Sequence, residues 1–130
     1  MTYAFDTNIL IHLLNYNELV IKRKDEAFAL GIRFVIPPVV DYEIRRGLLY
    51  KPSPKKYEMY KAFVKHYGVG EMSAEMWTKS ADIYSELRRR SLTIGDADIF
   101  IAAFCILNGY TLITNNKKHF DIIDDLLIDD

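Results

Sequence analysis

The sequence has little cysteine, no long hydrophobic run and almost no net charge. Its single cysteine, Cys105, cannot form an internal disulfide, which excludes a disulfide-built scaffold and favours a reducing compartment. The apolar residues around Cys105 indicate a buried thiol rather than a reactive one. No apolar run reaches the roughly 18 residues of a membrane span, and the N-terminus lacks the basic start of a signal peptide. We therefore expect a cytoplasmic protein that does not bind a membrane.

The net charge of −1 does not by itself suggest a nucleic-acid partner, but the charges are unevenly distributed. Basic residues gather between Arg45 and Lys65 and again at residues 88–90, whereas acids gather from Asp121 to Asp130. Such a distribution can give a nearly neutral protein a basic face. The alternative is that each run is an ordinary solvated helix surface.

The length of 130 residues suits one domain, residues 1–130, that needs no disulfide to hold its core. Strand-like and helical patterns alternate along it. The expected strands are residues 3–5, 33–36, 69–72 and 110–114. The expected helices are residues 7–14, 18–30, 39–49, 54–66, a long helix capped by Ser73, and 96–107, before a polar loop at 115–119 and an amphipathic tail at 120–127. This order predicts an α/β fold with a short, mostly parallel sheet of about four to five strands and helices on both faces.

Asp6 ends the first expected strand. Thr7 and Asn8 follow it with side chains that can start the next helix. In parallel α/β sheets, ligands bind at the carboxyl ends of the strands, which is where this residue is expected. Asp6 is therefore either a cap for the helix or a functional acid, and the local sequence leaves both interpretations open.

Glu43 borders an apolar stripe of its expected helix, with Val39, Val40 and Gly47 within one turn on the same side. Burial of an unpaired carboxylate is costly, so an acid at such a position needs a reason. The functional interpretation is a site acid, and the alternative is a half-exposed ion pair with Arg46.

Asp96 and Asp98 begin an otherwise apolar helix. Acids in a first turn interact favourably with the helix dipole, and Asp96 can serve as the cap. Asp98 lies beyond the cap. The two are about 200° apart around a helix, so they converge only if Asp96 lies in the entry turn. Thr114 and Asn116 follow the last expected strand, where ordinary turn chemistry is the alternative to a site role.

Together these polar groups are expected at one edge of one sheet. Carboxylates about 4 Å apart repel by roughly 4 kcal/mol at an effective dielectric of about 20, so clustered acids share protons or bind a cation. Without a Cys/His ligand pattern, Mg²⁺ or Mn²⁺ is favoured over zinc. Such an ion can activate a water for attack on phosphorus.

Four segments occur in an order that resembles the PIN domain family: DTNILI at 6–11, EIRRG at 43–47, IGDADIFIAA at 94–103 and TLITNNKKHF at 111–120. The size and motif order are similar to VapC-type toxins of toxin–antitoxin pairs. The resemblance implies a metal-dependent endoribonuclease, the toxin of a type II toxin–antitoxin system. Its substrate would be structured cellular RNA of the tRNA or rRNA class, hydrolysed by a water that Mg²⁺ or Mn²⁺ activates. A cognate VapB-like antitoxin and a homodimer are implied as well.

The resemblance also assigns residue roles. The residues that match catalytic positions are Asp6, Glu43, Asp96, Asp98 and Asn116. The first four of these match metal-binding acids, Asp96 being an additional acid found in some members. Asn116 stands where many members have an aspartate, which puts a second metal ion in doubt. The residues that match ligand-orienting positions are Thr7, Asn8 and Thr114.

Arg46, Lys51 and Lys55 are expected to contact RNA or the antitoxin, because phosphate binding needs cations beside the acids. Three tyrosines of the basic segment are candidates either for base stacking or for packing: Tyr57, Tyr60 and Tyr67. The three histidines are interpreted as surface or structural residues: His12, His66 and His119. Two other functions remain open. One is a non-catalytic PIN-fold interaction module, which Asn116 favours, and the other is the same chemistry on DNA.

Overall fold

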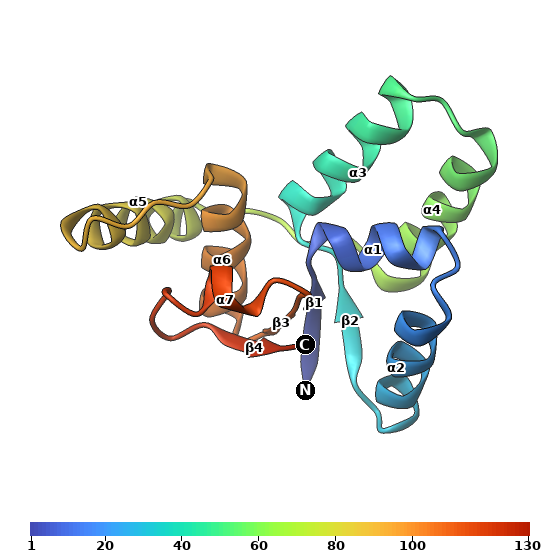
Figure 1. Ribbon diagram of the computed structural model, residues 1–130, viewed down its shortest axis with the longest axis horizontal. Coiled ribbons are helices and arrows are strands. Elements are labelled where there is room, and N and C mark those ends of the chain that lie inside the picture. The colour runs from blue at the N-terminus through green and yellow to red at the C-terminus, as the bar shows by residue number, and fades with distance from the viewer.

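A four-stranded parallel sheet forms the centre of the computed structural model, which describes residues 1–130 (Figure 1). Its strands are β1 (Thr2–Phe5), β2 (Arg33–Val35), β3 (Thr111–Ile113) and β4 (Leu127–Asp129). They lie in the order β2-β1-β3-β4, and all three pairings are parallel. The predicted α/β architecture with a short parallel sheet is therefore confirmed.

Seven helices connect and cover these strands. They are α1 (Thr7–Leu14), α2 (Glu18–Ala29), α3 (Pro38–Tyr50), α4 (Pro54–Tyr67), α5 (Ala74–Arg89), α6 (Asp96–Asn108) and α7 (Lys117–Phe120). Side chains of Asp6, Asn17 and Ser73 cap α1, α2 and α5, and prolines begin α3 and α4. Local cap chemistry thus fixes where most of these helices begin. None of them is both long enough and apolar enough to cross a membrane.

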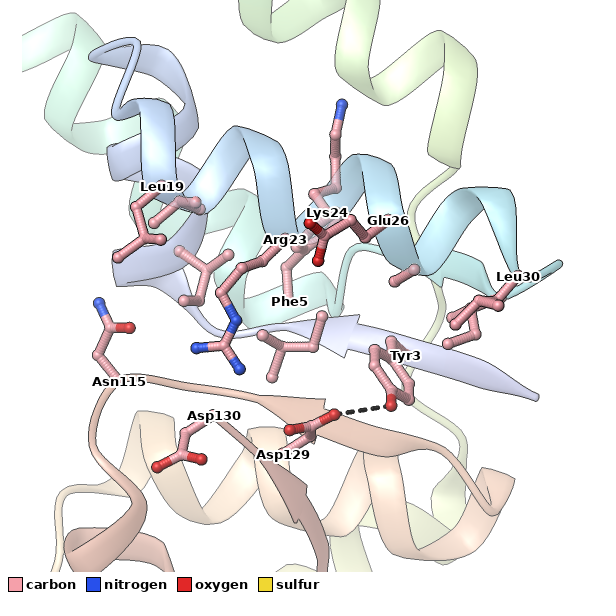
Figure 2. Close-up of a pocket in the computed structure, with 15 residues that line it drawn as sticks. Tyr3, Phe5, Leu19, Arg23, Lys24, Glu26, Leu30, Asn115, Asp129 and Asp130 are labelled. Carbon is pink, nitrogen blue, oxygen red and sulfur yellow. Dashed lines mark hydrogen bonds between the residues drawn. The ribbon is translucent and has the colours of Figure 1, made fainter.

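The two faces of the sheet are covered by different helices. Phe5 of β1 stacks on Phe34 of β2 with ring centroids 5.1 Å apart, and Tyr67 at the end of α4 meets both rings edge-on. Figure 2 shows α2 above this same face and α6 on the opposite side of the sheet. Alternate residues of a strand point to opposite faces, so Ala4 faces the α6 side, where it is fully buried.

The helix α6 forms the middle of the core. Its residues from Ile101 to Cys105 are buried, and burial raises the pKa of the Cys105 thiol well above its usual range. The prediction of a buried cysteine is confirmed. The helix ends at Gly109, whose φ of +69° is the left-handed conformation that glycine adopts most readily.

Two local predictions differ from the structure. The segment 69–72 was expected to be a strand, but it forms only one parallel bridge, between Val69 and Ile36. It does not continue as a strand because Pro37, which follows Ile36, ends the extended segment with which it pairs. Next to the bridge, a Cβ on Gly70 would lie only 2.3 Å from the Phe104 ring, so glycine is needed for this close approach.

The C-terminal segment also differs. The short helix α7 begins inside the expected polar loop, and the edge strand β4 begins at Leu127, the last residue of the expected amphipathic tail. Tyr3 on β1 donates a hydrogen bond of 2.7 Å to Asp129 of β4. A three-residue strand at a sheet edge has no clear sequence period, so the pattern of residues 120–127 did not reveal it.

Candidate active site

Asp6 lies at the carboxyl end of β1 and is only 6 % exposed. Its Oδ1 accepts the backbone N–H of Thr7 at 2.8 Å, and its Oδ2 accepts the Thr114 hydroxyl at 2.7 Å. Thr114 reaches Asp6 because it directly follows β3, the strand that pairs with β1. Asp6 is thus a helix cap and a buried acid at once, so the two interpretations of the sequence are compatible.

The pKa of Asp6 is raised above its usual value, mainly because burial disfavours the carboxylate. The hydrogen bonds from Thr114 and Thr7 oppose this shift, whereas the negative charges of Asp98 and Glu43 add to it. Three acids predicted from the sequence therefore interact at one edge of the sheet. They come from the end of β1, from α3 and from the first turn of α6.

Glu43 on α3 is joined to Asp6 through Thr7. The Thr7 hydroxyl donates to Glu43 Oε1 at 2.7 Å, while the Thr7 backbone N–H donates to Asp6. On its other side, Glu43 Oε2 lies 3.6 Å from Arg46 Nη2. The ion pair offered as the alternative for Glu43 is present, and only 20 % of the Glu43 side chain is exposed.

Asp98 is paired with a residue that the sequence analysis did not assign to the site. His119 Nε2 lies 2.8 Å from Asp98 Oδ2, and each side chain is about one-third exposed. The His119 ring also packs edge-on against the Phe120 ring. The backbone N–H of His119 donates a hydrogen bond to the backbone C=O of Asn116. The signal available in the sequence was its place in the polar segment directly after β3, at the same sheet edge as Asp6.

The other predicted site residues make fewer contacts. Asp96, Asn8 and Asn116 are exposed, and no side-chain hydrogen bond of theirs is present. The backbone N–H of Asn116 donates to the Thr114 hydroxyl at 2.9 Å, which ties this position to Asp6. Asp96 heads α6 without a side-chain cap, since Gly95 is the N-cap residue.

Lys51 and Lys55 lie at the far end of the α3–α4 hairpin, away from the sheet (Figure 1). Lys51 is eight residues beyond Glu43, a distance of about 12 Å along a helix, and Lys55 lies over the Tyr16 ring. The structure does not bring these two lysines to the acids. Lys56 was not predicted, yet it lines a groove of about 180 Å³ whose other lining residues include Glu43.

The tyrosines of the basic segment serve mainly in packing. Tyr60 is fully buried and donates a hydrogen bond of 2.7 Å to Asp41, while Tyr67 packs on the aromatic core. The Tyr57 hydroxyl accepts a bond from Arg45. Burial thus excludes base stacking for Tyr60, and the packing alternative is confirmed for Tyr60 and Tyr67.

The donors at this edge suit a hard divalent cation, because they are carboxylate and hydroxyl oxygens and the three carboxylates repel one another. No group of three His, Cys, Asp or Glu side chains is already converged on one point. Glu43 and Asp98 are instead directed toward Arg46 and His119. Binding of a cation beside Asp6 therefore requires these two acids to turn from their present partners.

A separate cavity of about 300 Å³ lies between α2 and the sheet (Figure 2). Apolar side chains make up most of its lining, and Arg23 and Asp129 are among its polar groups. None of Asp6, Glu43 and Asp98 lines it. This cavity is therefore separate from the edge of the sheet where the three acids lie.

A parallel α/β domain with a buried acid after its first strand and two more acids on flanking helices defines a class of candidate metal-dependent enzymes. The chain belongs to the PIN domain family, whose model matches residues 3–126. The predicted family is thereby confirmed.

Known relatives match along nearly the whole chain. It is 26 % identical over 135 residues to Ribonuclease VapC2 of Rickettsia felis, covering 99 % of this chain and 97 % of the relative. It is 27 % identical over 130 residues to Ribonuclease VapC1 of Haemophilus influenzae, covering 97 % and 95 %.

Solved structures agree with this family assignment. The structure of VapBC2 from Rickettsia felis, bound to a DNA fragment from their promoter, matches with a TM-score of 0.88 at 26 % identity, covering 99 % of this chain and 98 % of that chain. VapBC-1 from nontypeable Haemophilus influenzae matches with a TM-score of 0.88 at 23 % identity, covering 100 % and 98 %. The second likeness concerns the fold alone.

Proposed function

We propose that this PIN domain is an endoribonuclease of the VapC type, the toxin of a type II toxin–antitoxin pair. Its proposed reaction is hydrolysis of phosphodiester bonds in structured cellular RNA, of the tRNA or rRNA class, with Mg²⁺ or Mn²⁺ as cofactor. The observation that carries the proposal is buried Asp6, held by Thr7 and Thr114 and repelled by the charges of Glu43 and Asp98. The relatives named Ribonuclease VapC, which match along the whole chain, support it.

The three acids have different roles in this proposal. Asp6 is the fixed ligand, because two short hydrogen bonds orient its carboxylate before any cation arrives. Glu43 and Asp98 are the ligands that turn inward, and Thr7 keeps Glu43 beside Asp6. A bound divalent cation supplies a Lewis acid that activates water and offsets the charge of the phosphate.

The remaining predicted residues assist. Asp96 lies exposed at the head of α6, where it adds negative charge near the proposed cation. Asn116 is proposed to orient water, since its backbone is tied to Thr114 while its side chain is free. Thr7, Asn8 and Thr114 are the proposed ligand-orienting residues.

We also propose that the protein is cytoplasmic, forms a homodimer and is inhibited by a VapB-like antitoxin. The solved relatives support the antitoxin, because the Rickettsia felis structure is of VapBC2 and thus holds both components. The groove beside Glu43, with Lys56 among its lining residues, is the place where RNA and antitoxin would compete.

The test is cleavage of total cellular RNA by antitoxin-free protein in Mn²⁺, with Asp6→Asn beside the wild type. Asp82→Asn, an exposed acid of α5, is the matched control. We expect discrete cuts from wild type and control, and none from Asp6→Asn or in EDTA. Cleavage retained by a folded Asp6→Asn protein would contradict the proposal. Cleavage of DNA at the same rate would instead support a nuclease without RNA preference.

A further inference from the structure

Glu43 has both carboxylate oxygens engaged by neighbours in the chain. The Thr7 hydroxyl donates to Oε1 at 2.7 Å, and Arg46 Nη2 lies 3.6 Å from Oε2. A cation that takes Glu43 as a ligand therefore competes with these two groups for the carboxylate.

The contacts of Glu43 with Thr7 and with Arg46 differ in strength. Thr7 stands in the first turn of α1, and its bond to Glu43 has the length of a good hydrogen bond. The Arg46 side chain is 58 % exposed, and its 3.6 Å contact exceeds the usual length of an N–H···O bond, about 2.7–3.2 Å. Ion pairs this exposed are weak and screened by salt. Arg46 is therefore the group that leaves.

Arg46 has a second support that keeps it near the acids after it leaves. Its guanidinium carbon lies 5.1 Å from the centroid of the Tyr42 ring, which is itself exposed. A planar guanidinium can stack on such a ring and still present paired N–H groups to a phosphate. A released Arg46 would thus face solvent beside Glu43, where the phosphate of a bound RNA has to lie.

We propose that Arg46 is a displaceable counter-ion of Glu43. It neutralises Glu43 in the metal-free protein, and when a divalent cation takes Glu43 it turns to a phosphate of the RNA. This inference rests on the proposed function, and it adds a coupling: cation binding at Glu43 releases a positive charge for RNA binding.

The first experiment measures Mn²⁺ affinity by titration calorimetry without RNA, for wild type, Arg46→Ala and Arg46→Gln. We expect both variants to bind Mn²⁺ more tightly, because nothing competes for Glu43 Oε2. Arg88→Ala is the matched control. Arg88 lies 5.5 Å from the Tyr84 ring, with the same spacing in sequence as Arg46 and Tyr42, but it forms no salt bridge. The Mn²⁺ affinity of Arg88→Ala should equal that of wild type.

The second experiment measures binding of a fluorescein-labelled single-stranded RNA oligonucleotide in EDTA. Glu43→Gln should bind this RNA more tightly than wild type, because Arg46 is no longer held. Adding Arg46→Ala should remove most of that gain, because the double variant lacks the released positive charge and has the same net charge as wild type. The slope of log affinity against log salt should be steeper in Glu43→Gln than in the double variant by about 0.7 to 0.9, the value for one phosphate contact.

Unchanged or weaker Mn²⁺ affinity in both Arg46 variants would overturn the proposal, as would a gain in Glu43→Gln that persists without Arg46. These outcomes differ from failure of the proposed function. Wild-type protein that binds neither Mn²⁺ nor RNA would contradict the function itself. Wild-type protein that binds both, with no effect of Arg46, would overturn only the counter-ion role. Arg46 is exposed, so circular dichroism of either variant should match wild type.

Discussion

Thr114→Val tests how Asp6 is held, because it keeps the size of the side chain and removes only the hydroxyl. Thr114 is fully buried, and its hydroxyl donates to Asp6 Oδ2 and accepts the N–H of Asn116. The bond to the carboxylate contributes about 1.5 to 3 kcal/mol, and the bond from exposed Asn116 contributes about 0.5 to 1 kcal/mol. We therefore expect the free energy of unfolding to fall by about 2 to 4 kcal/mol near neutral pH.

The same substitution has a pH dependence of known sign. The Thr114 hydrogen bond lowers the pKa of Asp6, although burial keeps that pKa above its usual value. The bond thus stabilises the ionised form, so its contribution is present above the pKa of Asp6 and is lost as pH falls through it. The difference in stability between wild type and Thr114→Val should accordingly shrink in acid.

Urea denaturation at neutral and acidic pH measures both effects, with Thr114→Ser as the matched control. The serine keeps the hydroxyl and loses one methyl group, at a cost of about 0.5 to 1.5 kcal/mol. A valine variant that is as stable as the serine variant would show that the Thr114 hydroxyl does not hold Asp6. So would a loss of stability that is the same at both pH values.

Three further predictions concern other contacts. His119→Phe should tighten Mn²⁺ binding by up to about 5-fold in calorimetry, because Asp98 loses the partly exposed partner from which it has to turn, a contact of up to about 1 kcal/mol, whereas His119→Gln, which can still hold Asp98, should bind more like wild type; equal affinities of the two variants would contradict this role. Tyr60→Phe should lower stability by about 1 to 3 kcal/mol in urea denaturation and leave RNA cleavage unchanged, because its buried hydroxyl bonds only within the structural Asp41 cluster. Gly70→Ala should lower the thermal midpoint by the equivalent of about 1 to 3 kcal/mol, because its methyl group would clash with Phe104; an unchanged midpoint would show that the ring can move.

The parts of the site that the sequence revealed are those set by local chemistry. A short apolar run followed by Asp6, Thr7 and Asn8 predicts a strand, a cap and a helix, and the structure contains all three in that order. Glu43 and Arg46 are three residues apart on a helix, so their contact was also foreseeable. The resemblance to the PIN domain then selected a functional interpretation for acids that local rules also explain as caps and ion pairs.

The parts that the sequence did not reveal depend on contacts between distant segments. His119 meets Asp98 only because α7 and α6 lie at the same sheet edge, and 21 positions separate the two residues. Strand β4 pairs with β3 through a register that no periodicity encodes. Lys51 lies near Glu43 in the chain yet far from it in space, because α3 carries it toward the end of the hairpin (Figure 1).

We propose that Asp6, Glu43 and Asp98 together bind a divalent cation. The most direct measurement is Mn²⁺ calorimetry on wild type and Asp98→Asn in metal-free buffer, with Asp124→Asn, an exposed acid outside the site, as control. We expect wild type and Asp124→Asn to bind Mn²⁺ alike and Asp98→Asn to lose most of the affinity. A folded Asp98→Asn protein that binds Mn²⁺ as tightly as wild type would contradict the proposed metal site.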